Sequence, residues 1–277
     1  MTEIRSAVDF YARHPISAEI ILAKLKEARG NLDNVKSDEL LAHDQDRHGG
    51  LAVNDVLAER AQIKAGSRVA DFCAGLGGPA RYLAHKYGAD VTGIELTPAR
   101  VAGADQLTRL VGLLDKVRVL QGDVMQVPLP DAGMDAVISQ EAFLHVREVP
   151  RAFAEARRIL RPGGRFAFTN LVAERPLWEA DRQLMWDGMA AQRLYSFAEH
   201  RAFLEAAGFS VVSVEDLTAD WATILQQRFA MYRKLRAEAE RAGTSAGHDA
   251  FYRSYVLLVQ LVQAGELGGG RFTTVAP

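Results

Sequence analysis

The chain of 277 residues is 48% hydrophobic and 25% charged, and its 33 basic and 35 acidic residues give a net charge of −2. This is the profile of an ordinary globular protein with a core large enough for an enzyme. A nucleic-acid-binding protein would gather its lysines and arginines on one strongly basic surface. Here they are scattered among acids, so we expect no nucleic-acid partner.

Cysteine content and hydropathy indicate in which cellular compartment the protein works. Cys73 is the single cysteine, which excludes an intramolecular disulfide and a cysteine-rich metal cage. The N-terminus lacks the apolar core of a signal peptide, and no stretch approaches the roughly 20 apolar residues of a membrane helix. We therefore expect a cytoplasmic protein without membrane insertion. The sequence leaves open whether it forms a homo-oligomer.

Residues 1–64 show helical patterning. Ile20, Leu22 and Leu25 recur near helical spacing behind Pro15, and apolar residues recur similarly over 51–61. This pattern predicts an N-terminal helical cover.

From residue 65 the pattern changes to short β-rich runs alternating with helices, which is typical of βαβ units on a parallel sheet. A helix is predicted over 79–87, and another begins at Pro98 behind Thr97 as its N-cap. The turn Arg161-Pro-Gly-Gly164 is expected to stop a helix and reverse the chain. The predicted strands are 68–70, 90–94, 117–120, 136–139, 165–169, 209–214 and 271–275.

The last third of the chain is rich in helices. Ser196 and Glu199 form the capping box of a helix that ends at Gly208. Amphipathic patterns over about 174–193 and 220–264 predict lid helices, the second set lying between the last two strands.

A glycine-rich turn follows the first predicted strand. The segment Val69-Ala-Asp-Phe-Cys-Ala-Gly-Leu-Gly-Gly-Pro-Ala80 places Asp71 at the strand end, ahead of glycines and a helix. Glycines let the backbone approach a ligand closely, and the start of a helix offers free N–H groups. Taken alone, the segment is equally compatible with a tight turn that binds nothing.

Two further acids occupy equivalent positions. Glu95 closes the second strand, where a Rossmann-type site holds ribose hydroxyls, and Asp123 follows the third. Val124 beside Asp123 adds an apolar surface suited to an adenine ring. Because Asp71, Glu95 and Asp123 all fall at carboxyl ends of strands, the sequence predicts a shared ligand crevice.

Two rival functions have to be weighed. Gly75-Leu-Gly-Gly-Pro-Ala80 also fits the dinucleotide fingerprint, which makes a nicotinamide-dependent oxidoreductase the first rival. Against it, Asp71 suits a cationic group, whereas a pyrophosphate prefers a helix N-terminus without an acid beside it. A non-catalytic binding module ranks last, because it would be expected to have lost the three acids.

Together these residues resemble the class I S-adenosylmethionine-dependent methyltransferases, in particular the small-molecule branch of sarcosine/dimethylglycine, sterol and tocopherol methyltransferases. The resemblance covers roughly residues 44–275 and rests also on 135–145 and on Leu160-Arg-Pro-Gly-Gly-Arg165. It implies an α/β, Rossmann-like, seven-stranded and mostly parallel sheet with an antiparallel last strand, and a helical lid over the substrate. It also implies S-adenosyl-L-methionine as cofactor.

The resemblance implies the cofactor contacts as well. The first strand and its turn would face the methionine end, Glu95 the ribose, Asp123 with Val124 the adenine, and Gln140 the sulfonium. Cys73 departs from the family pattern, which usually has glycine there. The expected cofactor-binding residues are Asp71, Ala74, Gly75, Gly77, Glu95, Leu96, Asp123, Val124 and Gln140.

Methyl transfer is an in-line displacement that needs alignment, exclusion of water and, for some acceptors, removal of a proton. Glu141 and His145 follow the fourth strand four residues apart, and either could act as a base. His145 could equally cap or pack a short helix.

The polar segment 43–50 contains two histidines among carboxylates, but its spacing matches no standard metal site, so no metal is expected. Similar segments line the active site in the family, which makes Gln45 a candidate substrate contact and His48 a candidate catalytic residue. Tyr11 is expected to close over the site.

The methyl acceptor is less defined. Trp178 and Trp186 lie in the expected lid and could line its pocket, where an amine would gain cation–π attraction and an isoprenoid would gain burial. N-methylation of an amine or amino-acid-like small molecule is slightly preferred. C-methylation with Glu141 as the base is the alternative, and O-methylation is a third.

Overall fold

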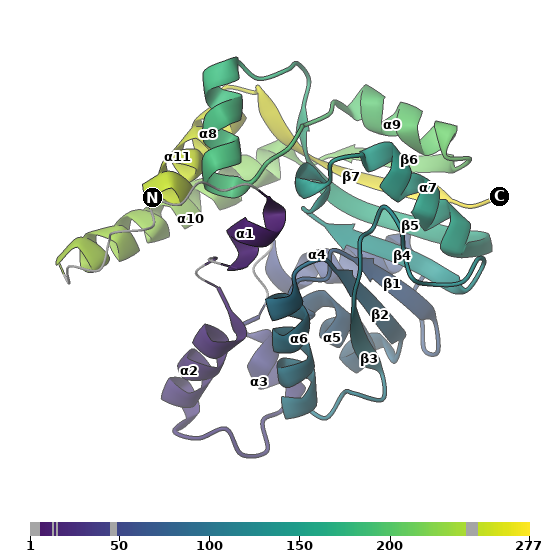
Figure 1. Ribbon diagram of the computed structural model, residues 1–277, viewed down its shortest axis with the longest axis horizontal. Helices are drawn as coiled ribbons and strands as arrows, with labels where there is room; N and C mark the ends of the chain where they lie inside the picture. Colours follow the sequence, from purple (N-terminus) through teal and green to yellow (C-terminus); the bar gives the residue numbers. More distant parts are fainter. Residues whose placement is uncertain (1–5, 13, 15, 45–48, 242–248) are drawn as a thin grey trace.

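The computed structural model describes residues 6–12, 14, 16–44, 49–241 and 249–277, arranged around a seven-stranded sheet (Figure 1). Every strand expected from the sequence is present, which confirms the α/β prediction. The strands are β1 (Arg68–Phe72), β2 (Asp90–Glu95), β3 (Val117–Gln121), β4 (Met134–Gln140), β5 (Leu160–Ala173), β6 (Ser210–Asp216) and β7 (Leu267–Val275).

The strands lie in the order β3-β2-β1-β4-β5-β7-β6. Pairing is parallel from β3 through β2, β1 and β4 to β5. β7 runs antiparallel to both its neighbours, β5 and β6, which confirms the expected antiparallel last strand. The sheet grows outward from β1 to β3, and then β4 returns to the other side of β1. Such a reversal opens a crevice at the carboxyl ends of the strands.

Helices cover both faces of the sheet because successive residues of each buried strand point to opposite sides. Val69 of β1 packs in one core with α4 (Gly50–Arg60) and α5 (Gly78–Tyr87). Ala70 packs in the other core with α7 (Val149–Ile159) and α9 (Phe197–Ala206). α6 (Pro98–Leu110) follows β2 and packs against β2 and β3.

Three short helices precede α4 in the described part of the N-terminal region, namely α1 (Ala7–Ala12), α2 (Ala18–Arg29) and α3 (Ser37–Leu41). The Ser17 side chain caps α2, whose Ile21 and Leu25 pack with Leu76 and Leu107. α2 is therefore attached to the sheet through α6 and the turn after β1.

The lid helices α8 (Glu179–Met189), α10 (Thr218–Arg241) and α11 (Asp249–Gln263) gather at one end of the sheet (Figure 1). Met185, Trp221 and Leu258 share one apolar core there. β7 lets α10 approach because Gly269 has no side chain: a Cβ there would lie 2.4 Å from an atom of the Trp221 ring. None of the helices in the described ranges has the length and apolar character needed to cross a membrane.

The segment Arg161–Gly164 directly follows the end of α7, as expected, and lies at an irregular point at the start of β5. Leu160 pairs with Met134 and Arg165 with Ala136, so the intervening residues form a bulge inside β5. Gly163 and Gly164 hydrogen-bond instead to Ala276, beyond the end of β7. Because β5 runs parallel to β4 and α7 connects the two, the chain reverses between α7 and β5, and Gly163, with a φ of 76°, allows the tight turn there.

Candidate active site

The carboxyl-end side of β1, β2 and β3, together with the loop after β4, opens into one pocket of about 460 Å³, which we call the strand-end pocket. Loops after these strands form its floor, and α1, α8 and the segment after α8 close it from the other side. Its lining includes Tyr11, Gly75, Glu95, Leu96, Asp123, Val124, His145 and Trp186.

The turn after β1 has an unusual backbone. Cys73, Gly75 and Gly77 have φ values of 59°, 58° and 77°. Glycine adopts such angles freely, whereas a cysteine there is strained. Gly93 of β2 makes room for the turn, since a Cβ on it would lie 2.6 Å from the Cβ of Ala74. The turn can therefore pack closely against β2 and present Gly75 to the pocket.

Glu95 at the end of β2 is 6% exposed and joins two loops. One carboxylate oxygen accepts the backbone N–H of Gly75 at 2.9 Å, and the other accepts that of Thr97 at 2.8 Å. A carboxylate offers about four acceptor positions, so Glu95 can still accept from a ligand. Two adjacent hydroxyls, as on a ribose, fit this remaining capacity.

Asp123 follows β3 and shapes the loop beside it. Its Oδ1 accepts the backbone N–H of Met125 at 2.8 Å, which leaves Oδ2 as a further acceptor. Val124, Met125 and Leu96 add apolar surface to the same pocket. An acceptor beside apolar walls suits a flat, partly polar ring such as adenine.

The end of β4 lies outside the pocket lining. Gln140 is 3% exposed and donates through Nε2 to Asn54 at 2.5 Å. Glu141 has a φ of 52°, and its backbone N–H donates to the carbonyl of Thr169 at 2.8 Å. The strained backbone at Glu141 turns the chain into the short helix Phe143–His145, which brings His145 to the pocket.

Tyr11 and His145 meet at the pocket, with the Tyr11 hydroxyl 2.8 Å from Nε2 of His145. Nδ1 of His145 lies 3.3 Å from the carbonyl oxygen of Ala190. Because a carbonyl only accepts, Nδ1 carries the hydrogen of the neutral ring, and Nε2 accepts from Tyr11. The Arg100 guanidinium lies 4.2 Å from the centre of the Tyr11 ring, a favourable cation–π distance.

Several residues expected at the site do not line the strand-end pocket. Asp71 is 2% exposed within β1 and, like Gly77, does not line the pocket. Ala74 lines a neighbouring cavity of about 70 Å³. Trp178 is 73% exposed at the start of α8, away from the pocket lining.

Gln45 and His48 lie outside the described residues. Asp44, just before them, forms an almost fully buried ion pair with Arg81 of α5 at 2.6 Å. This pair fixes the start of the polar segment next to the turn after β1. In the part of the chain that the structure describes, no group of three His, Cys, Asp or Glu side chains could hold a metal ion.

Arg100, Thr97 and Gln192 also line the pocket and were not expected there. Thr97 had a local signal, because it lies two residues after Glu95, the acid that ends β2. Arg100 had no local signal in the sequence, since its position at the pocket depends on how α1 docks against α6. Gln192 reaches the pocket because its backbone N–H donates to the carbonyl of Leu144 at 2.7 Å.

A family model described as "Methyltransferase domain" matches residues 70–168, from β1 to β5. The chain contains a methyltransferase domain. Within this methyltransferase domain lie Glu95, Asp123 and His145, together with the turn after β1. The predicted resemblance is thereby confirmed.

Two curated relatives methylate different kinds of atom, nitrogen in one and carbon in the other. The chain is 32% identical over 188 residues to a sarcosine/dimethylglycine N-methyltransferase of Halorhodospira halochloris, covering 68% of this chain and 65% of the relative. It is 34% identical over 171 residues to a sterol 24-C-methyltransferase of Gibberella zeae, covering 59% of this chain and 44% of the relative. The chain thus spans about half to two thirds of the length of these relatives.

Solved structures share the fold of the methyltransferase domain and of its cover. A putative sarcosine dimethylglycine methyltransferase from Galdieria sulphuraria has a TM-score of 0.74 at 20% identity, covering 94% of this chain and 98% of that one. A phosphoethanolamine N-methyltransferase of Haemonchus contortus has a TM-score of 0.77 at 22% identity, covering 99% of this chain and 61% of that one.

Proposed function

We propose that this protein transfers the methyl group of S-adenosyl-L-methionine to a small-molecule acceptor. The supporting observation is the strand-end pocket, which combines Glu95, held by two backbone N–H groups, with Asp123 and apolar walls. This pattern matches a ribose joined to an adenine. Both of the curated relatives described above are methyltransferases, which supports the same assignment.

In this proposal the bound cofactor supplies an electrophilic methyl group. Glu95 accepts the ribose hydroxyls, and Asp123 accepts from the adenine amino group while Val124 and Leu96 cover the ring. Gly75 and the turn after β1 would hold the methionine part. With the cofactor held in this way, alignment of the acceptor would be the main task left to the protein.

Tyr11 and His145 are proposed to manage the acceptor's proton. An acceptor that carries a proton would lose it to the Tyr11 oxygen as it is methylated. The Tyr11 proton passes to Nε2 of His145, which is oriented as its acceptor. α1 and Trp186 cover the pocket and keep water from competing.

Amine or hydroxyl acceptors fit this arrangement better than carbon acceptors. The phenol and imidazole line the pocket, whereas Glu141, the base expected for C-methylation, does not. We keep nitrogen as the preferred acceptor atom because the relative from Halorhodospira halochloris is an N-methyltransferase. A sterol-like carbon acceptor is the second candidate, supported by the sterol methyltransferase relative.

Calorimetric titration with S-adenosylhomocysteine tests the proposal. We expect saturable binding to the wild-type protein and at least about 100-fold weaker binding to Glu95→Ala, which loses two hydrogen bonds to a charged group. Glu59→Ala is the matched control, because Glu59 is an exposed acid on α4, away from the pocket. Absence of binding to the wild-type protein, together with binding of NADH, would establish the oxidoreductase rival instead.

A further inference from the structure

Arg100 is a buried cation in the lining of the strand-end pocket. It stands in the first turn of α6 and is 9% exposed. The start of a helix favours acids over bases, so the helix itself does not explain this arginine. Its guanidinium carbon lies 4.2 Å from the centre of the Tyr11 ring, and its Nη2 donates to the carbonyl of Ile16 at 3.3 Å. These contacts hold a permanent positive charge against the face of a phenol.

The hydroxyl of the same phenol is held by a different group. It lies 2.8 Å from Nε2 of His145, so Arg100 contacts the ring face while His145 accepts from the hydroxyl of Tyr11. A nearby positive charge favours the ionised form of a phenol. The effect is stronger where both groups are partly removed from water. This arrangement suits a phenol whose oxygen carries negative charge for a short time.

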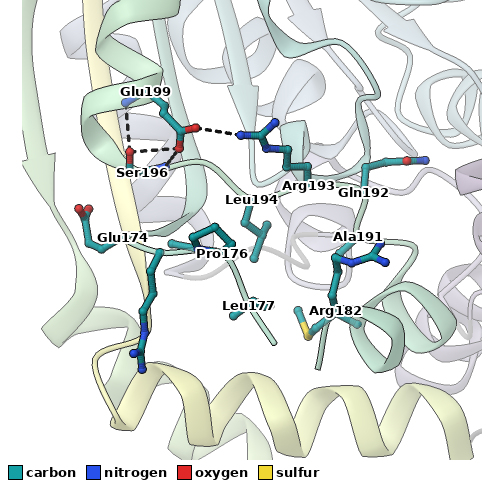
Figure 2. Close-up of a pocket in the computed structure, with 13 residues that line it drawn as sticks. Glu174, Pro176, Leu177, Arg182, Ala191, Gln192, Arg193, Leu194, Ser196 and Glu199 are labelled. Carbon is teal, nitrogen blue, oxygen red and sulfur yellow. Dashed lines mark hydrogen bonds and ion pairs between the residues drawn. The ribbon is translucent and has the colours of Figure 1, made fainter. Parts of the chain in front are cut away.

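The imidazole is oriented by the segment that follows α8. Nδ1 of His145 lies 3.3 Å from the carbonyl oxygen of Ala190. Two residues later, the backbone N–H of Gln192 donates to the carbonyl of Leu144 at 2.7 Å. Figure 2 shows Ala191 and Gln192 on this segment, at the edge of a second pocket of about 420 Å³. The segment thus fixes the ring with Nε2 toward the phenol.

Other groups close to Tyr11 are neutral or compensated when a phenol titrates. The ring centre of His14 lies 5.5 Å from that of Tyr11. Imidazoles such as those of His14 and His145 lose their charge well below the pH at which a phenol ionises. Asp44 borders Tyr11 in the neighbouring small cavity, and Arg81 compensates its charge at 2.6 Å.

The rest of the described pocket lining carries two carboxylates and one further arginine. Glu95 accepts two backbone N–H groups, and Asp123 accepts one. The Arg147 side chain is 72% exposed and pairs with Glu148 at 3.6 Å, so water and its partner screen its charge. The two carboxylates oppose the ionisation of a phenol, but they remain in place when Arg100 is substituted. A comparison of Arg100 variants therefore isolates the effect of this one guanidinium.

We propose that Arg100 is a positioning residue of the proton path: its guanidinium, stacked on Tyr11, stabilises negative charge on the phenol oxygen while His145 takes the hydroxyl proton. The step balances, since the oxygen gives one proton to Nε2 of His145 and gains one from the acceptor. The role of Arg100 in turnover rests on the proposed function. Its effect on the ionisation of Tyr11 needs neither cofactor nor acceptor.

NMR of the full chain, labelled with carbon-13 at Cζ of tyrosine, tests the proposal. The signal of Tyr11 is the one that Tyr11→Phe lacks, and its dependence on pH measures the acidity of this phenol. We expect Arg100→Met, which removes the charge but keeps an apolar stem, to make Tyr11 at least about tenfold weaker as an acid. Arg100→Lys restores a cation, so the acidity of Tyr11 should stay within about threefold of wild type.

Arg109→Met is the matched control, because Arg109 lies on the same helix, pairs with Asp105 at 3.0 Å and does not line the pocket. It should leave the titration of Tyr11 unchanged, and circular dichroism verifies that every variant is folded over the pH range used. An unchanged titration in Arg100→Met would overturn the proposal. So would an equal shift in Arg100→Met and Arg100→Lys, because the charge would then not be the cause.

Calorimetric titration with S-adenosylhomocysteine separates this inference from the proposed function. Arg100→Met should bind S-adenosylhomocysteine within about threefold of wild type, while its kcat falls at least about tenfold with a methyl acceptor found by screening. Weak cofactor binding together with an unchanged Tyr11 titration would assign Arg100 to the cofactor and overturn the inference. Absence of binding to the wild-type protein would refute the proposed function, whereas the titration of Tyr11 would still decide the effect of Arg100.

Discussion

Single residues set the geometry of the proposed reaction, and Tyr11 is the most testable. Tyr11→Phe keeps the ring under Arg100 but removes the hydroxyl that donates to His145. We expect kcat to fall about 100-fold, in the range of a lost proton-transfer group, with S-adenosylhomocysteine affinity within twofold of wild type. Steady-state kinetics measure this change, with a methyl acceptor first found by screening amines. Tyr87→Phe, which removes a hydroxyl on α5, should leave kcat unchanged, and equal kcat for all three proteins would exclude the proton path.

Cys73 gives a second prediction at this scale, because its backbone has a φ of 59°. Cys73→Gly and Cys73→Ala both remove the sulfur, but only glycine accepts this angle without strain. We expect Cys73→Gly to have a free energy of unfolding about 1 kcal/mol higher than Cys73→Ala. Urea unfolding of the two variants measures the difference. An alanine variant that is the more stable of the two would show that the turn relaxes in solution.

The sequence predicted the residues whose role is local. Glu95 and Asp123 could be placed because each follows a strand, and the strand ends of a parallel sheet meet at one edge. It did not predict Arg100, or the exposed position of Trp178, because both depend on how helices distant in the chain dock. The alternation of apolar and polar residues and the spacing of motifs carry no information about how distant helices dock.

At the scale of elements, the close approach of α10 to β7 is the feature to test. Gly269→Ala would place a methyl group within 2.4 to 2.8 Å of three atoms of the Trp221 ring. Trp221 is 3% exposed and cannot move aside freely, so we expect a loss of about 1–3 kcal/mol in the free energy of unfolding. Urea unfolding measures it.

The double variant Gly269→Ala/Trp221→Leu supplies the control. If the contact causes the loss, the two substitutions should be non-additive by at least about 0.5 kcal/mol, with the pair more stable than the sum of the singles predicts. Additive effects would mean that alanine disturbs β7 itself.

All seven strands were predictable as elements, whereas the bulge in β5 was not. Proline and glycines at Arg161–Gly164 are typical of a turn, and nothing local reveals that β7 lies alongside to bond with them.

At the scale of the whole molecule, His200 links three elements and makes stability depend on pH. It lies on α9, is fully buried, stacks on Phe272 of β7 at 4.9 Å and lies 3.1 Å from the Asn170 amide of β5. Burial lowers the pKa of His200. The folded protein therefore holds it neutral at pH values where the unfolded chain already binds a proton.

The free energy of unfolding should therefore fall as the pH drops below the ordinary histidine pKa of about 6.5, by up to about 1.4 kcal/mol per pH unit for this one proton. Above that pH the group contributes no slope. Urea unfolding between pH 5 and 8 measures it for wild type, His200→Gln and the surface variant His85→Gln. Only His200→Gln should lose the slope, and a wild-type slope in that variant would assign the proton to another group.

The position of β7 also bears on how the protein is made. Residues 267–275 leave the ribosome after every other described strand, yet β7 is the strand that joins β6 to the rest of the sheet. Until they emerge, β5 keeps an unpaired edge and β6 has no partner, and both can attract other chains. The sheet can therefore be completed only once β7 has emerged, which makes the nascent chain most dependent on protection just before residues 267–275 appear.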